Sequence, residues 1–115
     1  MSISIISITF GASPTTAVPL SSGTEVASSV LIQAKGGNNA GTGKNQGKVF
    51  IGNSSVVGNS PTTGIQLAVP MDGVTPPSVR FESGDNSNLF PLSSIYVAGV
   101  FQNDGIVAFC HIVGS

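Results

Sequence analysis

The sequence predicts an all-β protein: a single β-sandwich or jelly-roll-like barrel of about six to eight short antiparallel strands, with an extended N-terminal arm. Three observations support this fold class. Short apolar segments rich in β-branched residues recur along the chain, as is typical of strands. Clusters of Gly, Asn, Ser and Pro separate these segments. Finally, no window of about twelve residues shows a helical apolar period free of Gly and Pro, so no helix is expected.

The length of the chain fits one domain. Its 115 residues lie in the range of about 100 to 150 residues where single domains cluster, so a second core is not expected. We expect residues 1–20 to form the N-terminal arm, or first strand, and a linker. Residues 21–115 are expected to form the β-sandwich domain.

The first ten residues alternate between Ser or Thr and apolar residues, which is the period of a strand. The alternation slips once, at Ile5-Ile6, and predicts a bulge or a strand that passes from one surface to another. Pro14 and Pro19 then favour an extended linker. Two interpretations stay open: an arm that binds a partner, or the first strand of the domain itself. The candidate interaction residues of such an arm are its apolar ones: Ile3, Ile5, Ile6, Ile8 and Phe10.

Six further segments are predicted to be strands because they are short, apolar and β-branched. They are Val26 to Gln33, Val49 to Gly52, Ile65 to Val69, Val79 to Glu82, Ile95 to Val100 and Ile106 to Val113.

Three clusters of turn-forming residues connect these strands. The stretch from Gly36 to Gly47 predicts a hairpin loop that is mobile or ordered by a ligand, and Gly58-Asn-Ser-Pro predicts a tight connection. Asn103-Asp-Gly predicts a hairpin between the last two strands. Because both faces of these two strands are apolar, we expect one face to contact the core and the other a neighbouring molecule, with the pair at the centre of the sheet.

The composition excludes several classes of partner. Only 8% of the residues are charged and the net charge is −1, against a usual charged fraction of about 25%. A surface with so few charges favours association with other molecules over a monomeric state in dilute solution. The four cations, Lys35, Lys44, Lys48 and Arg80, are too few for binding to a phosphate backbone, so nucleic acid is not expected as a partner.

No segment has the length and apolar character of a membrane helix or of a signal peptide, which predicts a soluble protein that is not exported.

The sequence contains no strong catalytic or metal-binding motif. The stretch from Asn38 to Asn45 differs from a phosphate-binding loop at its first and last positions, and a strand follows it instead of a helix. Cys110 and His111 are adjacent on a predicted strand, so their side chains point to opposite faces and form no catalytic pair. We expect no cofactor, no metal and no enzymatic activity.

The acidic residues give no calcium-loop spacing. They are dispersed over turns and strand ends: Glu25, Asp72, Glu82, Asp85 and Asp104. Arg80 and Glu82 are spaced to form an ion pair on one face of a strand. A pair of carboxylates for glycoside hydrolysis would arise only if distant residues came together in the fold.

Four short stretches, taken in order, resemble small virion structural proteins of tailed bacteriophages. They are Gly-Lys-Val-Phe-Ile-Gly-Asn-Ser-Ser-Val (47–56), Thr-Gly-Ile-Gln-Leu (63–67), Leu-Ser-Ser-Ile-Tyr-Val-Ala-Gly (92–99) and Asp-Gly-Ile-Val-Ala (104–108). The resemblance covers about residues 24–113. The chain departs from the pattern in the stretch from Gly36 to Gly47 and in Val69 to Pro77, where we expect partner-specific contacts.

The resemblance implies a capsid decoration, or cement, protein, or else a tail or fibre accessory. On the first interpretation the protein is synthesised in the host cytoplasm and becomes part of the virion. It attaches to the outer surface of the assembled head as a homotrimer and stabilises contacts between major capsid protein subunits. The alternative is a tail or fibre module that binds a host receptor or a glycan. An enzyme is the third hypothesis.

Overall fold

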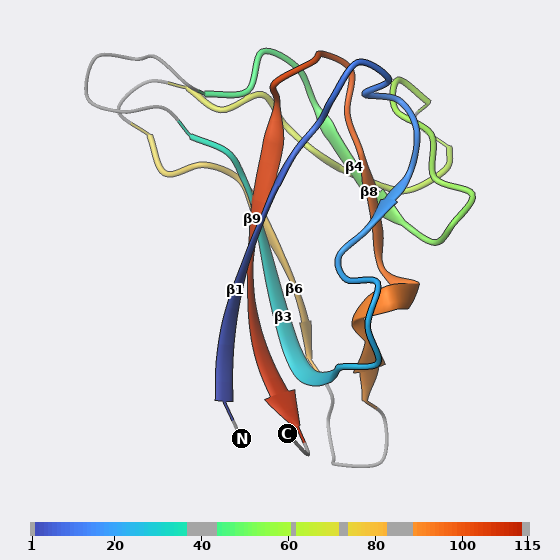
Figure 1. Ribbon diagram of the computed structural model, residues 1–115. Coiled ribbons are helices and arrows are strands. Elements are labelled where there is room, and N and C mark those ends of the chain that lie inside the picture. The colour runs from blue at the N-terminus through green and yellow to red at the C-terminus, as the bar shows by residue number, and fades with distance from the viewer. Residues whose placement is uncertain (1, 37–43, 61, 72–73, 83–88, 114–115) are drawn as a thin grey trace.

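The fold of the protein is described from a computed structural model over residues 2–36, 44–60, 62–71, 74–82 and 89–113. The molecule measures 40 × 30 × 21 Å. Two antiparallel sheets pack face to face (Figure 1), which confirms the predicted all-β sandwich. Within these ranges no helix has the length and hydropathy needed to cross a membrane.

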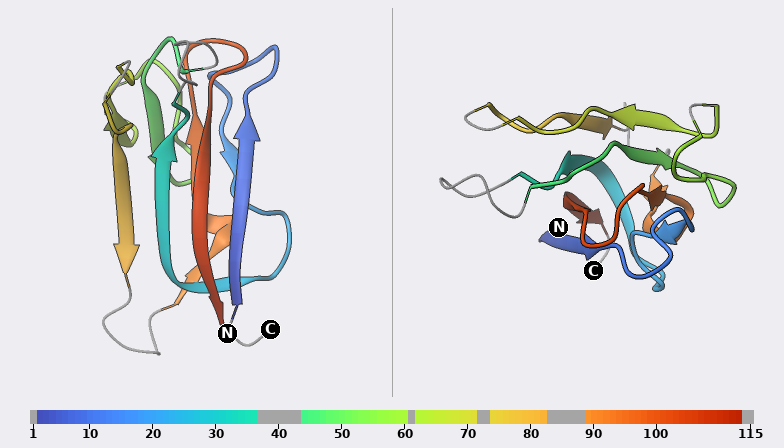
Figure 2. Two further views of the ribbon diagram at one scale, coloured as in Figure 1. Left: turned by 90° about the vertical axis from the view of Figure 1, so that its left-hand side faces the viewer. Right: turned by 90° about the horizontal axis from the view of Figure 1, so that it is seen from above.

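The first sheet, sheet A, contains the two longest strands, and Figure 2 (left) looks onto its outer face. Its strands lie in the order β1-β9-β3-β6, and the short strand β7 pairs with the start of β3. The bounds are Ser2–Thr9 for β1, Gly105–Val113 for β9, Val26–Ala34 for β3, Ser78–Glu82 for β6 and Phe90–Pro91 for β7.

The second sheet, sheet B, consists of shorter strands in the order β2-β8-β4-β5. A single turn of 3-10 helix, η1 (Leu92–Ser94), leads into β8. The strand bounds are Val18–Pro19 for β2, Tyr96–Ala98 for β8, Val49–Gly52 for β4 and Ile65–Leu67 for β5.

The core lies between the two sheets and follows from the alternation of side chains along each strand. In β3 a register shift between Ala27 and Ser29 changes the phase of this alternation. As a result Ala27 before the shift and Val30 and Ile32 after it all point inward and are fully buried. Opposite them, sheet B contributes buried residues such as Ile51. A bulge in β3 thus keeps one face of a nine-residue strand apolar.

The first strand belongs to the domain. β1 pairs with β9 residue by residue from Ser2 to Thr9, so the structure corresponds to the second interpretation of this segment. The register of this pairing contains no shift, and the bulge predicted at Ile5-Ile6 is therefore wrong. Instead, the slip in the sequence places apolar side chains on both faces of one regular strand.

The predicted hairpin between the last two strands is also wrong. β8 lies in sheet B and β9 in sheet A, so the turn at Asn103-Asp-Gly passes from one sheet to the other. Asn103 has the positive φ of 73° that such a turn requires. Each strand is still flanked by neighbours on both sides, β8 by β2 and β4, and β9 by β1 and β3. The apolar character of the two strands therefore reflects a central position in two different sheets.

The stretch from Gly36 to Gly47 likewise joins different sheets, because it links β3 to β4. It is therefore not a hairpin loop between paired strands, and its residues 37–43 lie outside the described ranges. The six predicted strands are all present, and β4 has the predicted bounds. Two strands were not predicted, β2 and β7, each of which has two residues and contains a proline.

Candidate functional site

The outer face of sheet A, which points away from sheet B, carries a group of apolar side chains. The pairing of the strands places Ile5 of β1, Phe109 of β9 and Leu31 of β3 in one row across the sheet. Ile3 and Val107 lie two residues along from this row and so on the same face. We refer to these five side chains as the apolar patch: Ile3, Ile5, Leu31, Val107 and Phe109.

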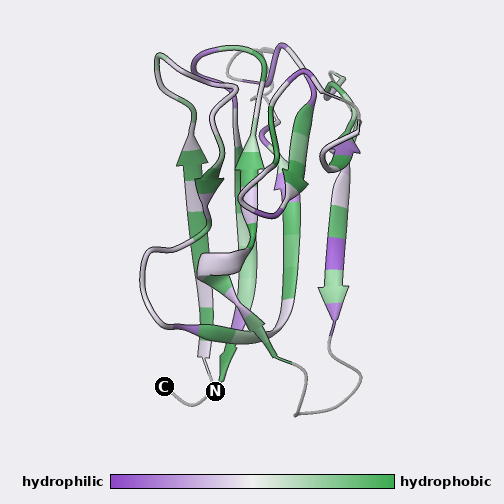
Figure 3. Cartoon of the chain, turned by 90° about the vertical axis from the view of Figure 1, so that its right-hand side faces the viewer, coloured by the Kyte–Doolittle hydropathy of each residue, from purple (hydrophilic) through white to green (hydrophobic). Residues whose placement is uncertain are grey.

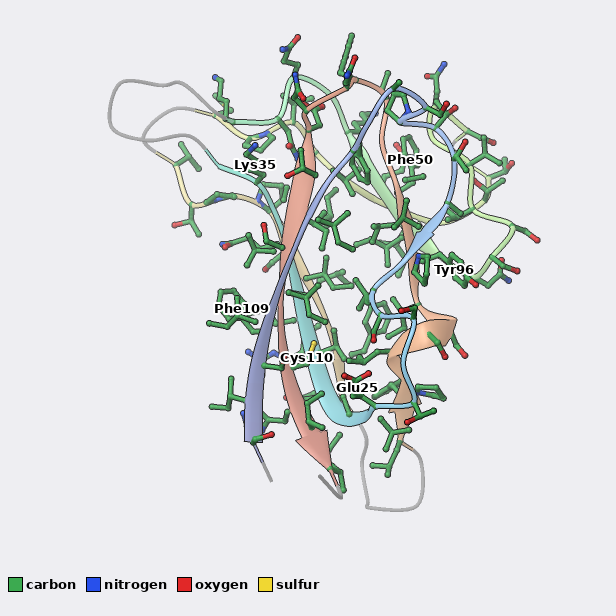
Figure 4. All side chains as sticks on the ribbon, viewed as in Figure 1. Glu25, Lys35, Phe50, Tyr96, Phe109 and Cys110 are labelled. Carbon is green, nitrogen blue, oxygen red and sulfur yellow. The ribbon has the colours of Figure 1, made fainter. Side chains whose placement is uncertain are left out.

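Much of the apolar patch is exposed. Ile3 and Ile5 are 67% and 65% exposed, Phe109 is 38% exposed, and Leu31 and Val107 are half-buried. In Figure 4 the ring of Phe109 points away from the second sheet. Contiguous apolar surface of this kind marks sites where proteins bind other macromolecules.

Polar and charged residues border the apolar patch on β6. Arg80 lies opposite Leu31, and its Nη1 atom is 3.1 Å from Oε1 of Glu82. This confirms the predicted ion pair, whose side chains are 54% and 61% exposed. Because the pair is exposed, it stabilises the fold by at most about 1 kcal/mol.

The five predicted interaction residues divide between the two faces of the sheet. Ile3 and Ile5 point outward into the apolar patch. Ile6 and Ile8 are half-buried and pack against the core, and Phe10 is only 2% exposed. Binding through all five residues is therefore excluded in this fold, because a strand presents alternate side chains to opposite faces.

Sequence reasoning did not assign Leu31, Val107 or Phe109 to the site. The sequence contained a signal for Val107 and Phe109, because both faces of the last strand are apolar and one face was expected to contact a neighbouring molecule. Val107 and Phe109 lie on the face of β9 that points away from the core, and Phe109 is exposed there. No comparable signal identified Leu31, because its place in the row depends on the register between β3 and β9.

A buried polar cluster holds the end of the β3–β4 connection against the start of β9. Asn45 is fully buried; its Nδ2 donates to the carbonyl oxygen of Gly105 at 2.8 Å, and its Oδ1 accepts from the N–H of Gly105 at 2.7 Å. The carboxylate of Asp104, 2% exposed, accepts from the N–H groups of Gln46 at 2.9 Å and Gly47 at 3.0 Å. This cluster is structural, since every one of these polar atoms is used within the fold.

One member of the buried polar cluster, Asn45, belongs to the stretch that resembles a phosphate-binding loop. Asn38 and Gly43 lie outside the described residues. Asn45 stands where such a loop has a Ser or Thr for magnesium, but its side chain is engaged by Gly105. This position therefore contributes to folding and not to nucleotide binding.

Cys110 and His111 point to opposite faces, as predicted. Cys110 is fully buried between the sheets (Figure 4), and His111 is exposed on the outer face of sheet A. Burial raises the pKa of the Cys110 thiol, which keeps it protonated at neutral pH. The two side chains form no nucleophilic pair.

Cys110 should therefore be inert toward thiol reagents in the native protein. We expect Ellman's reagent at pH 8 to label it at least about 100-fold more slowly than it labels the chain unfolded in denaturant, because the reagent needs an accessible thiolate. The pKa of this thiol is higher in the folded than in the unfolded chain, so it stabilises the folded state below the ordinary pKa of a thiol. This contribution to stability is lost as the pH rises through the pKa of the folded state. Labelling of native protein as fast as unfolded chain would contradict the burial.

The described acidic residues do not converge. Glu82 lies at the end of β6, whereas Glu25 and Asp104 lie in the separate connections before β3 and β9. Asp72 and Asp85 fall outside the described ranges. Within those ranges no group of three or more His, Cys, Asp or Glu residues could hold a metal ion.

A cleft of about 640 Å³ opens between the sheets on the side of β5 and β6. Phe81 and Phe90 line it with ring centroids 6.1 Å apart, and Ile51, Ile65 and Ile95 complete the apolar part of the wall. Among the residues that the structure describes, no charged side chain lines this cleft. The described part of the cleft therefore offers apolar surface and the hydroxyl groups of Thr62, Thr63 and Ser94, without a charged acid or base.

No protein-family model matches the chain, and no curated protein or solved structure is significantly similar to it. The resemblance to phage virion proteins accordingly stays a prediction from the four sequence motifs.

Proposed function

We propose that this protein is a decoration protein of a bacteriophage head and that the apolar patch of sheet A binds the outer surface of the capsid. The observation that carries this proposal is the row of Ile5, Phe109 and Leu31 on an open sheet face. The proposal also rests on the four sequence motifs and on the scarcity of charge. On this proposal the partner is the major capsid protein, and the bound protein stabilises contacts between its subunits.

The apolar patch is large enough to contribute to binding. Full burial of an isoleucine contributes about 1.5 to 3 kcal/mol, and Ile3 and Ile5 are each about two-thirds exposed. Their burial would therefore contribute about 2 to 4 kcal/mol per copy. Because β1 is already paired with β9, little of this free energy is lost in ordering the strand.

The low charge of the chain suits this mode of binding. Ion pairs buried in an interface carry desolvation costs that hydrogen bonds of Ser, Thr and Asn largely avoid. The outer side chains of β1 beyond the apolar patch are Ser7 and Thr9, both exposed. They can hydrogen-bond to a partner without bringing a charge into the interface.

The proposal is tested by replacing the two most exposed isoleucines together, Ile3→Lys and Ile5→Lys. We expect the double variant to bind heads at least about 30-fold more weakly, since it loses about 2 kcal/mol of apolar burial and adds two ammonium groups. The measurement is co-sedimentation of purified protein with heads prepared without it. Circular dichroism checks that the variant is folded.

The matched control is Ile65→Lys, which changes an exposed isoleucine on β5 of the other sheet. It should bind heads like the unchanged protein. Equal loss of binding in the control would contradict a role specific to sheet A, and an unchanged protein that does not sediment with heads would contradict the proposal as a whole. Binding to a glycan array without binding to heads would favour the tail or fibre alternative.

A further inference from the structure

We propose that the open edge of β1 pairs with the same edge of a second copy of this chain, so that sheet A continues through a dimer. The two β1 strands would run antiparallel across a twofold axis perpendicular to the sheet. This inference rests on the geometry of the strand edge and does not depend on attachment to a phage head.

The backbone of β1 alternates between groups that face β9 and groups that face the open edge. The N–H of Phe10 donates to the carbonyl oxygen of Asp104 at 2.7 Å, and the carbonyl of Phe10 accepts from Asn103 at 2.9 Å, so the polar groups of Phe10 face β9. In an antiparallel strand the N–H and C=O of one residue point the same way, and this direction reverses at each residue. The even-numbered residues of β1 therefore bond to β9, and the odd-numbered residues present their backbone groups to the open edge: Ile3, Ile5, Ser7 and Thr9.

The β1 edge also lacks the features that protect strand edges from pairing. It is eight residues long, and it contains no charged residue and no proline. Its pairing with β9 contains no bulge. Natural proteins usually protect an edge of this length with charges, prolines, bulges or a covering segment.

The other four outer strands of the described sheets are protected. β7, which pairs with β3, has two residues, one of them Pro91. β6 has five residues and carries Arg80 and Glu82. β2 has two residues, one of them Pro19, and β5 has three residues. In Figure 3 strongly hydrophilic residues (purple) interrupt β6, whereas β1 alternates between hydrophobic and pale residues.

A second copy of β1 is complementary to the first. In antiparallel pairing the odd-numbered residues of one copy lie opposite the odd-numbered residues of the other, and their free N–H and C=O groups meet. One such register places Ile3 opposite Ile5 of the second copy, and symmetry repeats this pair. Neither strand carries a charge, so no repulsion opposes the contact.

Symmetry then fixes the size of the assembly. Contact between two identical edges is isologous and closes as a dimer, because it leaves neither β1 edge free for a third copy. The same symmetry keeps the outer faces of both sheets on one side. The apolar patches of the two copies would therefore form one continuous surface. The geometry favours this dimer over the homotrimer expected from the sequence.

The area of contact between the two β1 edges is small, so we expect weak dimerisation. Eight residues of strand span about 26 Å, and contact along one edge of this length lies at the low end of stable interfaces. We therefore expect a dissociation constant in the range of about 1 to 100 μM. Sedimentation velocity over about 0.5 to 300 μM of the full chain should show a monomer–dimer equilibrium in the absence of heads.

The variant Ile5→Pro tests whether the edge itself makes the dimer. Proline at this position removes an N–H that faces the open edge and leaves the bonds to β9 intact, as edge strands tolerate. We expect dimerisation to weaken at least about 30-fold. The control Ile5→Thr keeps the N–H and the preference for strand but loses most of the apolar side chain, and it should still dimerise. Equal loss of the dimer in both variants would show that apolar contact, and not edge pairing, holds the copies together.

Amide hydrogen exchange of the unchanged protein keeps the inference testable if Ile5→Pro does not fold. Above the dissociation constant, the amides of Ile3, Ile5 and Ser7 should exchange at least about 10-fold more slowly than below it. The amide of Ile6 should be protected at both concentrations, because it bonds to β9. A monomer up to 300 μM, a trimer, or a dimer without slower exchange at the odd positions would overturn the inference.

Discussion

Replacing Asp104 with alanine is expected to lower the free energy of unfolding by about 3 to 5 kcal/mol. The carboxylate accepts from the N–H groups of Gln46 and Gly47, and each hydrogen bond to a charged group contributes about 1.5 to 3 kcal/mol. Alanine removes both acceptors and leaves these two N–H groups without partners. Denaturation by guanidinium chloride, followed by circular dichroism, measures the difference.

Two comparisons make this expectation specific to the carboxylate. Asp104→Asn should cost less than Asp104→Ala, because an amide oxygen still accepts one of the two hydrogen bonds. Glu82→Ala removes a carboxylate whose ion pair with Arg80 is exposed on β6, and it should change the stability by no more than about 1 kcal/mol. If Asp104→Ala and Glu82→Ala had similar effects, the buried cluster would not hold the fold in the way that we describe.

Replacing Gly58 with alanine is expected to cost at least about 3 kcal/mol of stability. A Cβ at this position would overlap the carbonyl oxygen of Gly99 and lie 2.9 Å from the Cα of Thr15. Backbone hydrogen bonds fix all three segments, since Gly58 N donates to Thr15 O at 3.0 Å and Gly99 N donates to Pro14 O at 2.8 Å. The neighbours are backbone atoms, so a change of side-chain rotamer cannot make room. Thermal or chemical denaturation of the purified variant measures the loss.

Gly11→Ala is the matched control for this substitution. Gly11 is exposed, and a Cβ added there would have no neighbour within 4 Å. The change should therefore be within about 1 kcal/mol of neutral, and it can be slightly stabilising because alanine restricts the unfolded chain. Equal stability of the two alanine variants would contradict the close approach at Gly58.

The sequence predicted the fold class and most strands because both depend on local patterns. β4 was predicted with its correct bounds, and β3 was predicted one residue too short, since alternation and β-branched residues are local signals. β2 and β7 were missed because each has two residues and contains a proline. The hairpin at Asn103 was wrong because turn residues determine where the chain reverses, not which sheet each strand joins.

The candidate site was only partly predictable for the same reason. The repeat of isoleucines in β1 has two apolar faces, and the pairing with β9 determines that Ile6 points inward and Ile5 outward. Asp104 was treated as a turn residue because its partners, Gln46 and Gly47, lie 58 and 57 residues away in the sequence. Contacts of this range leave no periodic signal in a single sequence.

The place of β9 has a consequence for biosynthesis. β9 follows all the other strands along the chain, yet it lies between β1 and β3 in sheet A. While the ribosome is still translating the preceding strands, neither β1 nor β3 has this neighbour, and the isoleucines of both are open to water. Sheet A can therefore be completed only after β9 has emerged, and a nascent chain halted before that point would leave the isoleucines of β1 exposed to solvent, which favours aggregation.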